Sequence, residues 1–90
     1  MRYVLVYDVA DDRRRARLFR RLQRWLTPVQ RSVFEGQDPP IEAIRDLVLD
    51  ETDGREDDVR IYALCRACAD RVEHLGVAVP LPDPDVPVVV

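Results

Sequence analysis

The segment Tyr3–Tyr7 constrains the fold most, because it is a continuous apolar run (YVLVY) that ends at a single acidic residue, Asp8. An uninterrupted run of this length is typical of a central strand that is buried on both faces. The acidic pair Asp11 and Asp12 follows, and acidic residues are favoured where a helix begins. The sequence therefore predicts a central strand that leads through a short acidic turn into a helix capped by Asp11 or Asp12.

The predicted helix has two different faces. Apolar residues recur at three- and four-residue spacing and form a stripe that we expect to be buried: Leu18, Phe19, Leu22, Trp25 and Leu26. Arginines at i, i+4, i+7 and i+11 share the opposite face: Arg13, Arg17, Arg20 and Arg24. Pro28 is expected to end this helix.

The remaining pattern predicts five further segments. Residues 29–36 are expected to be extended with a kink, and the proline pair at 39–40 opens a second helix, whose inward residues are Ile41, Ile44, Leu47 and Val48. Residues 50–58 (DETDGREDD) are expected to form a solvated polar loop, because they lack the spacing of a calcium-binding loop. Residues 59–65 alternate as a strand with one apolar face. Residues 68–76 indicate a helical turn followed by a brief strand.

The order of these elements predicts a fold class. It fits a single α+β domain over residues 1–76, a ferredoxin-like α/β plait of βαββαβ order whose two helices cover one face of the sheet. Residues 77–90 form a proline-rich tail, and its last residues, 86–90, favour a strand that pairs with the sheet edge of a partner. Burial of the uncovered face predicts a symmetric homodimer.

The charges are distributed unevenly along the chain. The net charge is −3, but residues 1–37 carry nine arginines against four acidic residues, whereas residues 38–90 carry five arginines against thirteen. All fourteen basic residues are arginine. A molecule of this kind can face a polyanion with one surface only.

Composition also excludes several classes of protein. No apolar run approaches the ~20 residues of a membrane span, and the N-terminus lacks the long apolar region of a signal peptide. The two cysteines, Cys65 and Cys68, belong to one C-x-x-C motif, which argues against a secreted disulfide scaffold. We therefore expect a cytoplasmic protein that does not bind membranes.

Asp8 and the arginines suggest a chemistry. A carboxylate at a strand end can hold a hard cation such as Mg²⁺, and arginine side chains suit phosphate. Together they indicate phosphodiester chemistry or nucleic-acid binding. Two simpler interpretations stay open: Asp8 caps the turn after its strand, and the arginines form an ordinary solvated helix face.

Several short motifs carry a resemblance to a known family. These are Tyr7-Asp8, the acidic pair with the arginines that follow it, Gln-x-Ser-Val-Phe-Glu at 30–35, Arg-Ile-Tyr-Ala-Leu-Cys at 60–65 and Val-Glu-His-Leu-Gly at 72–76. In this combination, residues 1–76 resemble the CRISPR-associated protein Cas2 family. One departure is Pro28, which stands before Val29 where the family often has a basic residue.

The resemblance implies a function. It implies a ferredoxin-like homodimer that bridges the CRISPR integrase and duplex DNA during spacer acquisition. Some members of the family are described as metal-dependent endonucleases on single-stranded RNA or duplex DNA. Asp8 would then be the catalytic and metal-binding residue, with Mg²⁺ or Mn²⁺ as cofactor. The candidate nucleic-acid contacts are Arg13, Arg14, Arg15, Arg17, Arg20, Arg24 and Arg31.

Three further residues are expected to support the Asp8 site. Tyr7 packs or forms a hydrogen bond across the dimer, and Ser32 binds either the Asp8 loop or only backbone. Phe34 is expected in the core rather than as a stacking platform for a base. If two copies of Asp8 meet near a two-fold axis, they must share a proton or bind a cation.

Other interpretations stay open beside the leading one. Cys65 and Cys68 are expected to pack locally, the alternatives being a redox pair or half of a zinc site. His74 is expected to be structural. The alternative functions are a DNA-bridging and integrase-docking module without catalysis, a toxin-like ribonuclease of the same fold, and a small-molecule regulatory domain.

Overall fold

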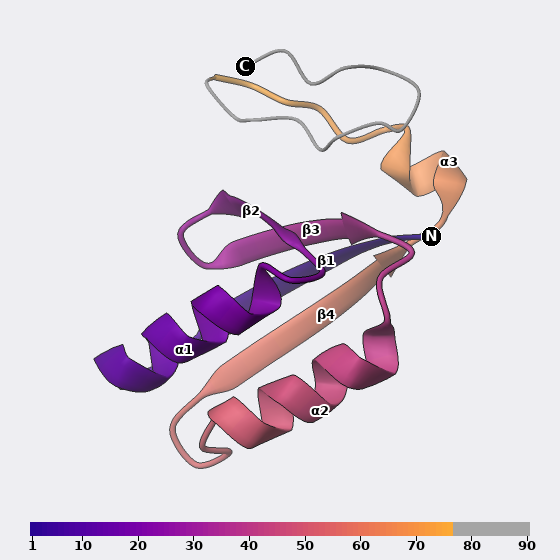
Figure 1. Cartoon of the computed structure of the whole chain (residues 1–90). Coiled ribbons are helices and arrows are strands. Elements are labelled where there is room, and N and C mark those ends of the chain that lie inside the picture. The colour runs from indigo at the N-terminus through magenta and orange to yellow at the C-terminus, as the bar shows by residue number, and fades with distance from the viewer. Residues whose placement is uncertain (77–90) are drawn as a thin grey trace.

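The computed structural model describes residues 1–76, and the predicted tail and C-terminal strand at 77–90 lie outside the described residues. The elements run in βαββαβ order, followed by a short third helix (Figure 1). They are β1 (Arg2–Asp8), α1 (Asp12–Leu22), β2 (Thr27–Gln30), β3 (Val33–Gln37), α2 (Ile41–Glu51), β4 (Asp58–Leu64) and α3 (Arg66–Ala69). The predicted ferredoxin-like fold class is confirmed.

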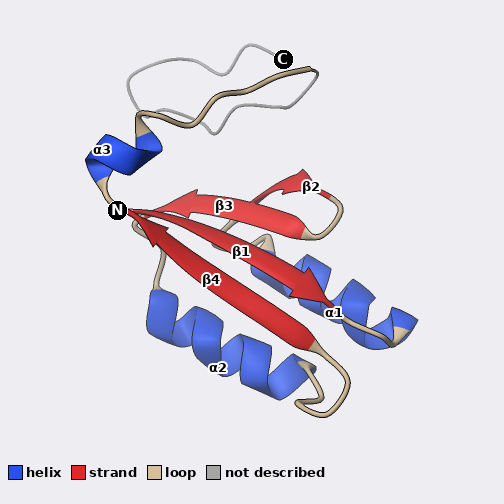
Figure 2. Ribbon diagram, turned by 180° about the vertical axis from the view of Figure 1, so that it is seen from behind, coloured by secondary structure: helices blue, strands red, loops and turns tan. Residues whose placement is uncertain are grey.

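The four strands form one antiparallel sheet in the order β2-β3-β1-β4, so β1 is central. Helices α1 and α2 lie on the same face of this sheet (Figure 2). Leu5 and Tyr7 point toward the helices and are buried, whereas Val4 and Val6 point to the other face and are only half-buried. Within one copy of the chain, this strand is therefore buried on one face only.

The core lies between the helices and the sheet. Its buried members are Leu5, Tyr7, Val9, Leu18, Leu22, Leu26, Phe34, Ile44 and Leu47. The ring of Phe34 has no exposed surface and lies 5.3 Å from the ring of Phe19 and 6.1 Å from that of Tyr7, between centroids. The prediction that Phe34 belongs to the core is confirmed.

Helix α1 ends earlier than the sequence predicted. Its N-cap is Asp11, whose carboxylate accepts a hydrogen bond of 2.9 Å from the backbone N–H of Arg14. The last helical residue is Leu22, whose carbonyl accepts hydrogen bonds from the next turn of chain. Leu26 still reaches the core from beyond the helix end. Pro28 lies within β2 and does not mark the end of the helix.

The segment expected to be one extended stretch, residues 29–36, is part of a hairpin of two strands. β2 and β3 pair antiparallel, with a turn at Arg31 and Ser32 and a bulge between Pro28 and Gln30. Gly36 allows this hairpin to pack closely, since a Cβ there would lie 2.5 Å from a methyl carbon of Leu26.

The second half of the domain follows the predicted pattern up to α3. Ile44 and Leu47 of α2 are buried, and Val59 and Ile61 of β4 pack against the core. Between residues 70 and 76 the structure has no strand, so the predicted brief strand is wrong. None of the helices within residues 1–76 has the length and apolarity needed to cross a membrane.

Replacing the central aromatic residue should cost much of the stability of the domain. Phe34→Ala is expected to lower the free energy of unfolding by about 3–5 kcal/mol, because the large buried ring leaves a cavity. Leu49→Ala is the control, since that side chain is 76% exposed and should change the value by no more than about 0.5 kcal/mol. Urea unfolding measures both; equal losses would place Phe34 outside the core.

Candidate active site

An open groove of about 910 Å³ lies between α1 and the β2–β3 turn, at the end of β1 where Asp8 stands. Its lining residues are Tyr7, Asp8, Val9, Asp12, Arg13, Arg15, Ala16, Arg17, Phe19, Arg20, Arg31 and Ser32. The fold thus brings Asp8 and five of the seven candidate arginines to one groove. Of the other sequence-selected residues, Tyr7 and Ser32 line it, whereas Phe34 does not.

Asp8 is exposed, and within residues 1–76 its carboxylate has no hydrogen bond or ion pair. Other acidic residues stabilise the turn that follows β1. Asp57 accepts a hydrogen bond of 2.9 Å from the backbone N–H of Ala10, and Asp11 caps the helix. The alternative that Asp8 is the turn cap is therefore not supported, and its carboxylate is available to a ligand.

Asp57 is a residue whose importance the sequence did not indicate. Its buried carboxylate also accepts hydrogen bonds from the backbone N–H of Asp53 (2.8 Å) and from Nε of Arg14 (3.1 Å). The Arg14 guanidinium, followed by the backbone N–H groups of Asp53 and Ala10, lowers the pKa of Asp57 to about 2. Residues 50–58 are thus more than a solvated loop, because Asp57 fastens the loop to the start of α1.

Two candidate arginines lie outside the groove. Arg14 pairs with Asp57 and with Glu56, at 3.1 and 3.2 Å, so its charge is used within the fold. The guanidinium of Arg24 lies over the Trp25 ring, 5.4 Å from the ring centroid, in a cation–π arrangement.

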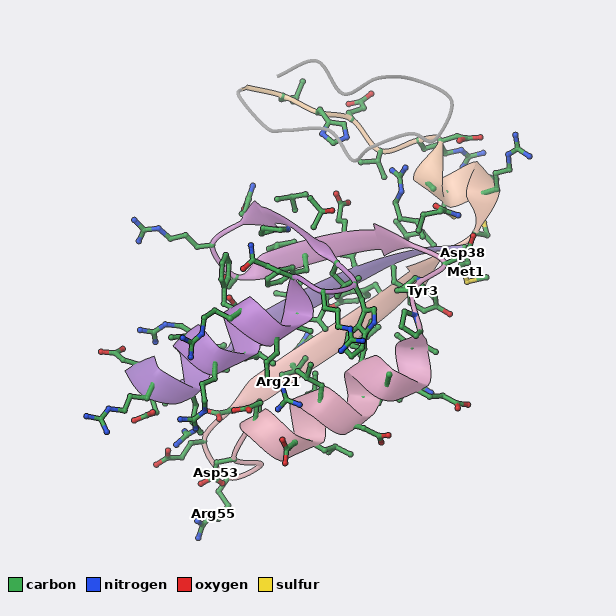
Figure 3. All side chains as sticks on the ribbon, in the orientation of Figure 1. Met1, Tyr3, Arg21, Asp38, Asp53 and Arg55 are labelled. Carbon is green, nitrogen blue, oxygen red and sulfur yellow. The ribbon has the colours of Figure 1, made fainter. Side chains whose placement is uncertain are left out.

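A second ion-pair cluster joins α1 to α2. The carboxylate of Glu51 accepts hydrogen bonds from Nε of Arg17 (2.9 Å) and from Nη1 of Arg21 (2.6 Å), and Arg21 also contacts Asp50 (2.8 Å). Arg17 and then Arg21 lower the pKa of Glu51. Figure 3 shows Arg21 between the two helices. The arginine face is thus partly a docking surface for the domain's own acidic residues.

Three groove arginines keep their charges free of protein partners. Arg13, Arg20 and Arg31 are exposed and make no side-chain hydrogen bond or ion pair within the described part of the chain. Arg15 is partly used, since it donates to the carbonyl of Val9 (3.0 Å) and pairs with Asp12. The free guanidinium groups give the groove a surface that suits phosphate oxygens.

Tyr7 holds the β2–β3 turn against the end of β1. Its hydroxyl donates to the carbonyl of Arg31 (2.9 Å), and its backbone N–H donates to the carbonyl of Ser32 (3.1 Å). Burial raises the pKa of Tyr7. The contact of Ser32 with this strand is therefore through backbone, and Tyr7 fixes one wall of the groove from the core.

The carboxylates near the groove fit part of a magnesium site. Strand register places Asp58 of β4 opposite Asp8, although Asp58 also pairs with Arg60 at 3.2 Å. Mg²⁺ is usually held by one or two carboxylates, with water and substrate phosphate completing its shell. No group of three or more metal-ligating side chains occurs within residues 1–76. One chain therefore offers Asp8, with Asp58 beside it, as a partial set of hard oxygen ligands.

Comparison with known proteins decides the family. A sequence model of the CRISPR-associated protein Cas2 family matches residues 1–72. The chain belongs to the Cas2 family. It is 37% identical over 86 residues to a protein of Methanospirillum hungatei named CRISPR-associated endoribonuclease Cas2, an alignment that covers 89% of this chain and 91% of that protein. A namesake from Chloroflexus aurantiacus is 33% identical over 84% of this chain and 85% of its own.

Solved structures agree with this assignment. Cas2 of Streptococcus pyogenes superposes with a TM-score of 0.71 at 29% identity, over 84% of this chain and all of that one. A hypothetical protein from Thermus thermophilus gives a TM-score of 0.76 at 36% identity, over 91% and 96% of the two chains. The resemblance that the sequence motifs indicated is confirmed for this Cas2 protein.

Asp57 should be the carboxylate on which the stability of this site depends. Because its pKa is lowered from 3.8 to about 2, its stabilising effect is full above about pH 4 and is lost as the pH falls toward 2. Asp57→Asn should lower Tm at pH 7, and its difference from the wild type should shrink over that acidic range. Thermal unfolding monitored by circular dichroism measures both.

Asp58→Asn is the matched control for this prediction. It removes the neighbouring carboxylate, whose side chain is 65% exposed, and should leave Tm nearly unchanged at either pH. Equal effects of the two substitutions would contradict the assigned role of Asp57.

Proposed function

We propose that this Cas2 protein is a metal-dependent endonuclease that cleaves single-stranded RNA or duplex DNA at the Asp8 groove. The observation that carries the proposal is an exposed carboxylate without a partner in the described chain, on the same groove as three free arginines. Relatives that match most of the chain carry the name endoribonuclease, which supports the same chemistry. The metal would be Mg²⁺ or Mn²⁺, which prefer oxygen ligands.

In the groove, the arginines would bind the substrate and the carboxylates would hold the cation. Arg13, Arg20 and Arg31 would bind phosphate groups of the substrate and hold its backbone across the groove. Asp8, with Asp58 beside it, would hold the cation. When bound, such a cation polarises a phosphoryl oxygen and lowers the pKa of a coordinated water. Because directly opposed carboxylates repel each other, a cation at this point also relieves that repulsion.

A homodimer would complete the site. The sheet face that α1 and α2 leave uncovered presents the apolar side chains of Val4, Val6 and Tyr62, of which Tyr62 is 49% exposed. Asp8 follows on the same face of β1, because alternate residues of a strand share a face. A second copy packed on this face would cover the apolar residues and bring a second Asp8 carboxylate toward the first.

The biological setting that fits best is CRISPR adaptation. In this setting the protein works beside the integrase, and the groove arginines carry duplex DNA during spacer acquisition. An alternative is a bridging module that binds DNA without cleaving it. The free arginines favour that alternative as well, since phosphate binding by them needs neither Asp8 nor a metal.

Removing the charge of Asp8 should greatly slow cleavage without unfolding the protein. Asp8→Asn keeps the size of an exposed side chain but loses the ligand for the cation, so we expect at least a hundredfold (~10²) slower cleavage. The assay uses labelled single-stranded RNA and labelled duplex DNA, each with Mg²⁺ or EDTA. Asp46→Asn, at an exposed acidic residue of α2, is the control and should cleave like the wild type.

The outcomes of this assay separate the two functions. Mg²⁺-dependent cleavage that disappears in Asp8→Asn supports the nuclease and identifies its substrate. Equal cleavage by both proteins contradicts a catalytic Asp8. Binding of duplex DNA without cleavage by any variant contradicts the nuclease and leaves the bridging module.

The free arginines should account for a measurable part of the salt dependence of binding. For duplex DNA, each phosphate contact contributes about 0.9 to the slope of log K against log salt. The double variant Arg13→Gln and Arg20→Gln should therefore reduce the slope by about 1.8. The control is Arg45→Gln, on the exposed side of α2, which should leave the slope unchanged. Fluorescence anisotropy at several salt concentrations measures the slopes. Equal slopes for the double variant and the wild type would show that duplex DNA does not bind at Arg13 and Arg20.

A further inference from the structure

The C-x-x-C motif is not explained by the Asp8 site or by packing. Cys65 follows directly after β4, and Cys68 lies within α3. Both are free thiols, and both are exposed. The expectation that these side chains pack locally is therefore wrong, and the reason lies in the orientation of α3.

Helix α3 faces the rest of the protein with a side that does not carry the cysteines. Arg66, Ala69 and Asp70 line a pocket of about 340 Å³ together with Met1 and Arg2. The helix lies beyond the end of the sheet, next to the N-terminus (Figures 1 and 2). Since positions i, i+3 and i+4 of a helix share a face, the face that Arg66, Ala69 and Asp70 form is turned toward the protein. The cysteines, one position earlier, are left on the solvent side.

The backbone places the two thiols close to each other. Cys65 has the extended conformation of an N-cap residue (φ −65°, ψ 166°), and its carbonyl accepts a 2.9 Å hydrogen bond from Ala69. The third residue of the first turn is Cys68, so the two thiols belong to the same turn of chain. Side chains three residues apart on a helical turn have Cβ atoms about 5–6 Å apart, and a disulfide needs about 3.5–4.5 Å. Closing the bond therefore requires a small local shift of this exposed turn.

The two thiols also differ in reactivity. The backbone N–H and the thiol of Cys68 lower the pKa of Cys65, whereas Cys65 raises the pKa of Cys68. Cys65 is therefore the better nucleophile of the pair near neutral pH, because the thiolate is the attacking species.

We propose that Cys65 and Cys68 form a redox-active dithiol, which closes to a reversible intramolecular disulfide by exchange with a low-molecular-weight disulfide. A zinc site fits less well, because a structural zinc ion takes four ligands and no third metal-ligating side chain joins the pair within residues 1–76.

The exchange balances in two steps. The Cys65 thiolate attacks one sulfur of the external disulfide, forms a mixed disulfide and releases one external thiolate. The Cys68 thiol loses its proton to solvent and attacks the Cys65 sulfur, which closes the internal bond and releases the second external thiolate. The two released thiolates take up protons. The dithiol thus loses two electrons and two protons, and the external disulfide becomes two thiols.

This proposal is independent of the nuclease. In the pairing of β1 with β4, Asp8 lies opposite Asp58 at one end, whereas Arg2 lies opposite Leu64 at the other, next to Cys65. The dithiol and the groove therefore stand at opposite ends of the sheet. Oxidation should leave the binding of duplex DNA unchanged.

The test uses the purified 90-residue chain equilibrated with mixtures of reduced and oxidised glutathione. Remaining thiols are then blocked with N-ethylmaleimide, and the intact mass is measured. The wild type should convert to a species that is two hydrogen atoms lighter and carries no maleimide, and excess reduced glutathione should reverse this. Cys68→Ser should stop at a glutathione adduct on Cys65, and Cys65→Ser should react more slowly.

Three outcomes would overturn the proposal. The first is a wild type that carries glutathione on both cysteines without an internal bond. The second is a disulfide between two copies, visible as a dimer in non-reducing electrophoresis. The third is bound Zn²⁺ that protects both thiols from the maleimide, which would assign the motif to a metal. The substituted residues are exposed, so both serine variants should fold like the wild type.

Discussion

The buried carboxylate of Asp57 is the interaction on which the candidate site depends. It receives hydrogen bonds from the turn after β1, from its own loop and from Arg14 at the start of α1. Two segments that are distant in sequence, residues 10–14 and the loop at residues 53–57, therefore meet at one charged group. A buried carboxylate is tolerated only when its oxygens have such partners. Asp57 accepts the hydrogen bond of the backbone N–H of Ala10 in the turn after β1. Asp8, two residues before Ala10, is therefore not needed to stabilise this turn, and its carboxylate can bind a ligand.

Much of the fold could be predicted from local patterns. The apolar spacing in α1 and α2 correctly identified Leu18, Leu22, Ile44 and Leu47 as buried, and the strand that ends at Asp8 is central as expected. The errors occurred where local signals are weak or tertiary contacts override them. The hairpin of β2 and β3 was taken as one strand, because its turn at Arg31 and Ser32 contains no glycine, proline or asparagine to mark it in the sequence.

The candidate site was predictable only in part. The position of Asp8 at a strand end and the run of arginines were visible in the sequence. Which arginines remain free was not, because Arg14 and Arg17 find their acidic partners 43 and 34 residues away. For the same reason Asp58 was missed, since strand register places it beside Asp8. The exposure of Cys65 likewise follows from the side by which α3 packs.

The groove has one property that follows from its use of arginine alone. The chain contains no lysine, so every positive side chain on the groove is a guanidinium, which stays protonated at any pH at which proteins fold. Its attraction for a polyanion cannot be weakened by deprotonation. Acetylation of lysine, a common way for cells to cancel a positive charge, has no target there. The positive charge of this surface is therefore permanent, and its affinity for a polyanion is set by the salt concentration rather than by pH.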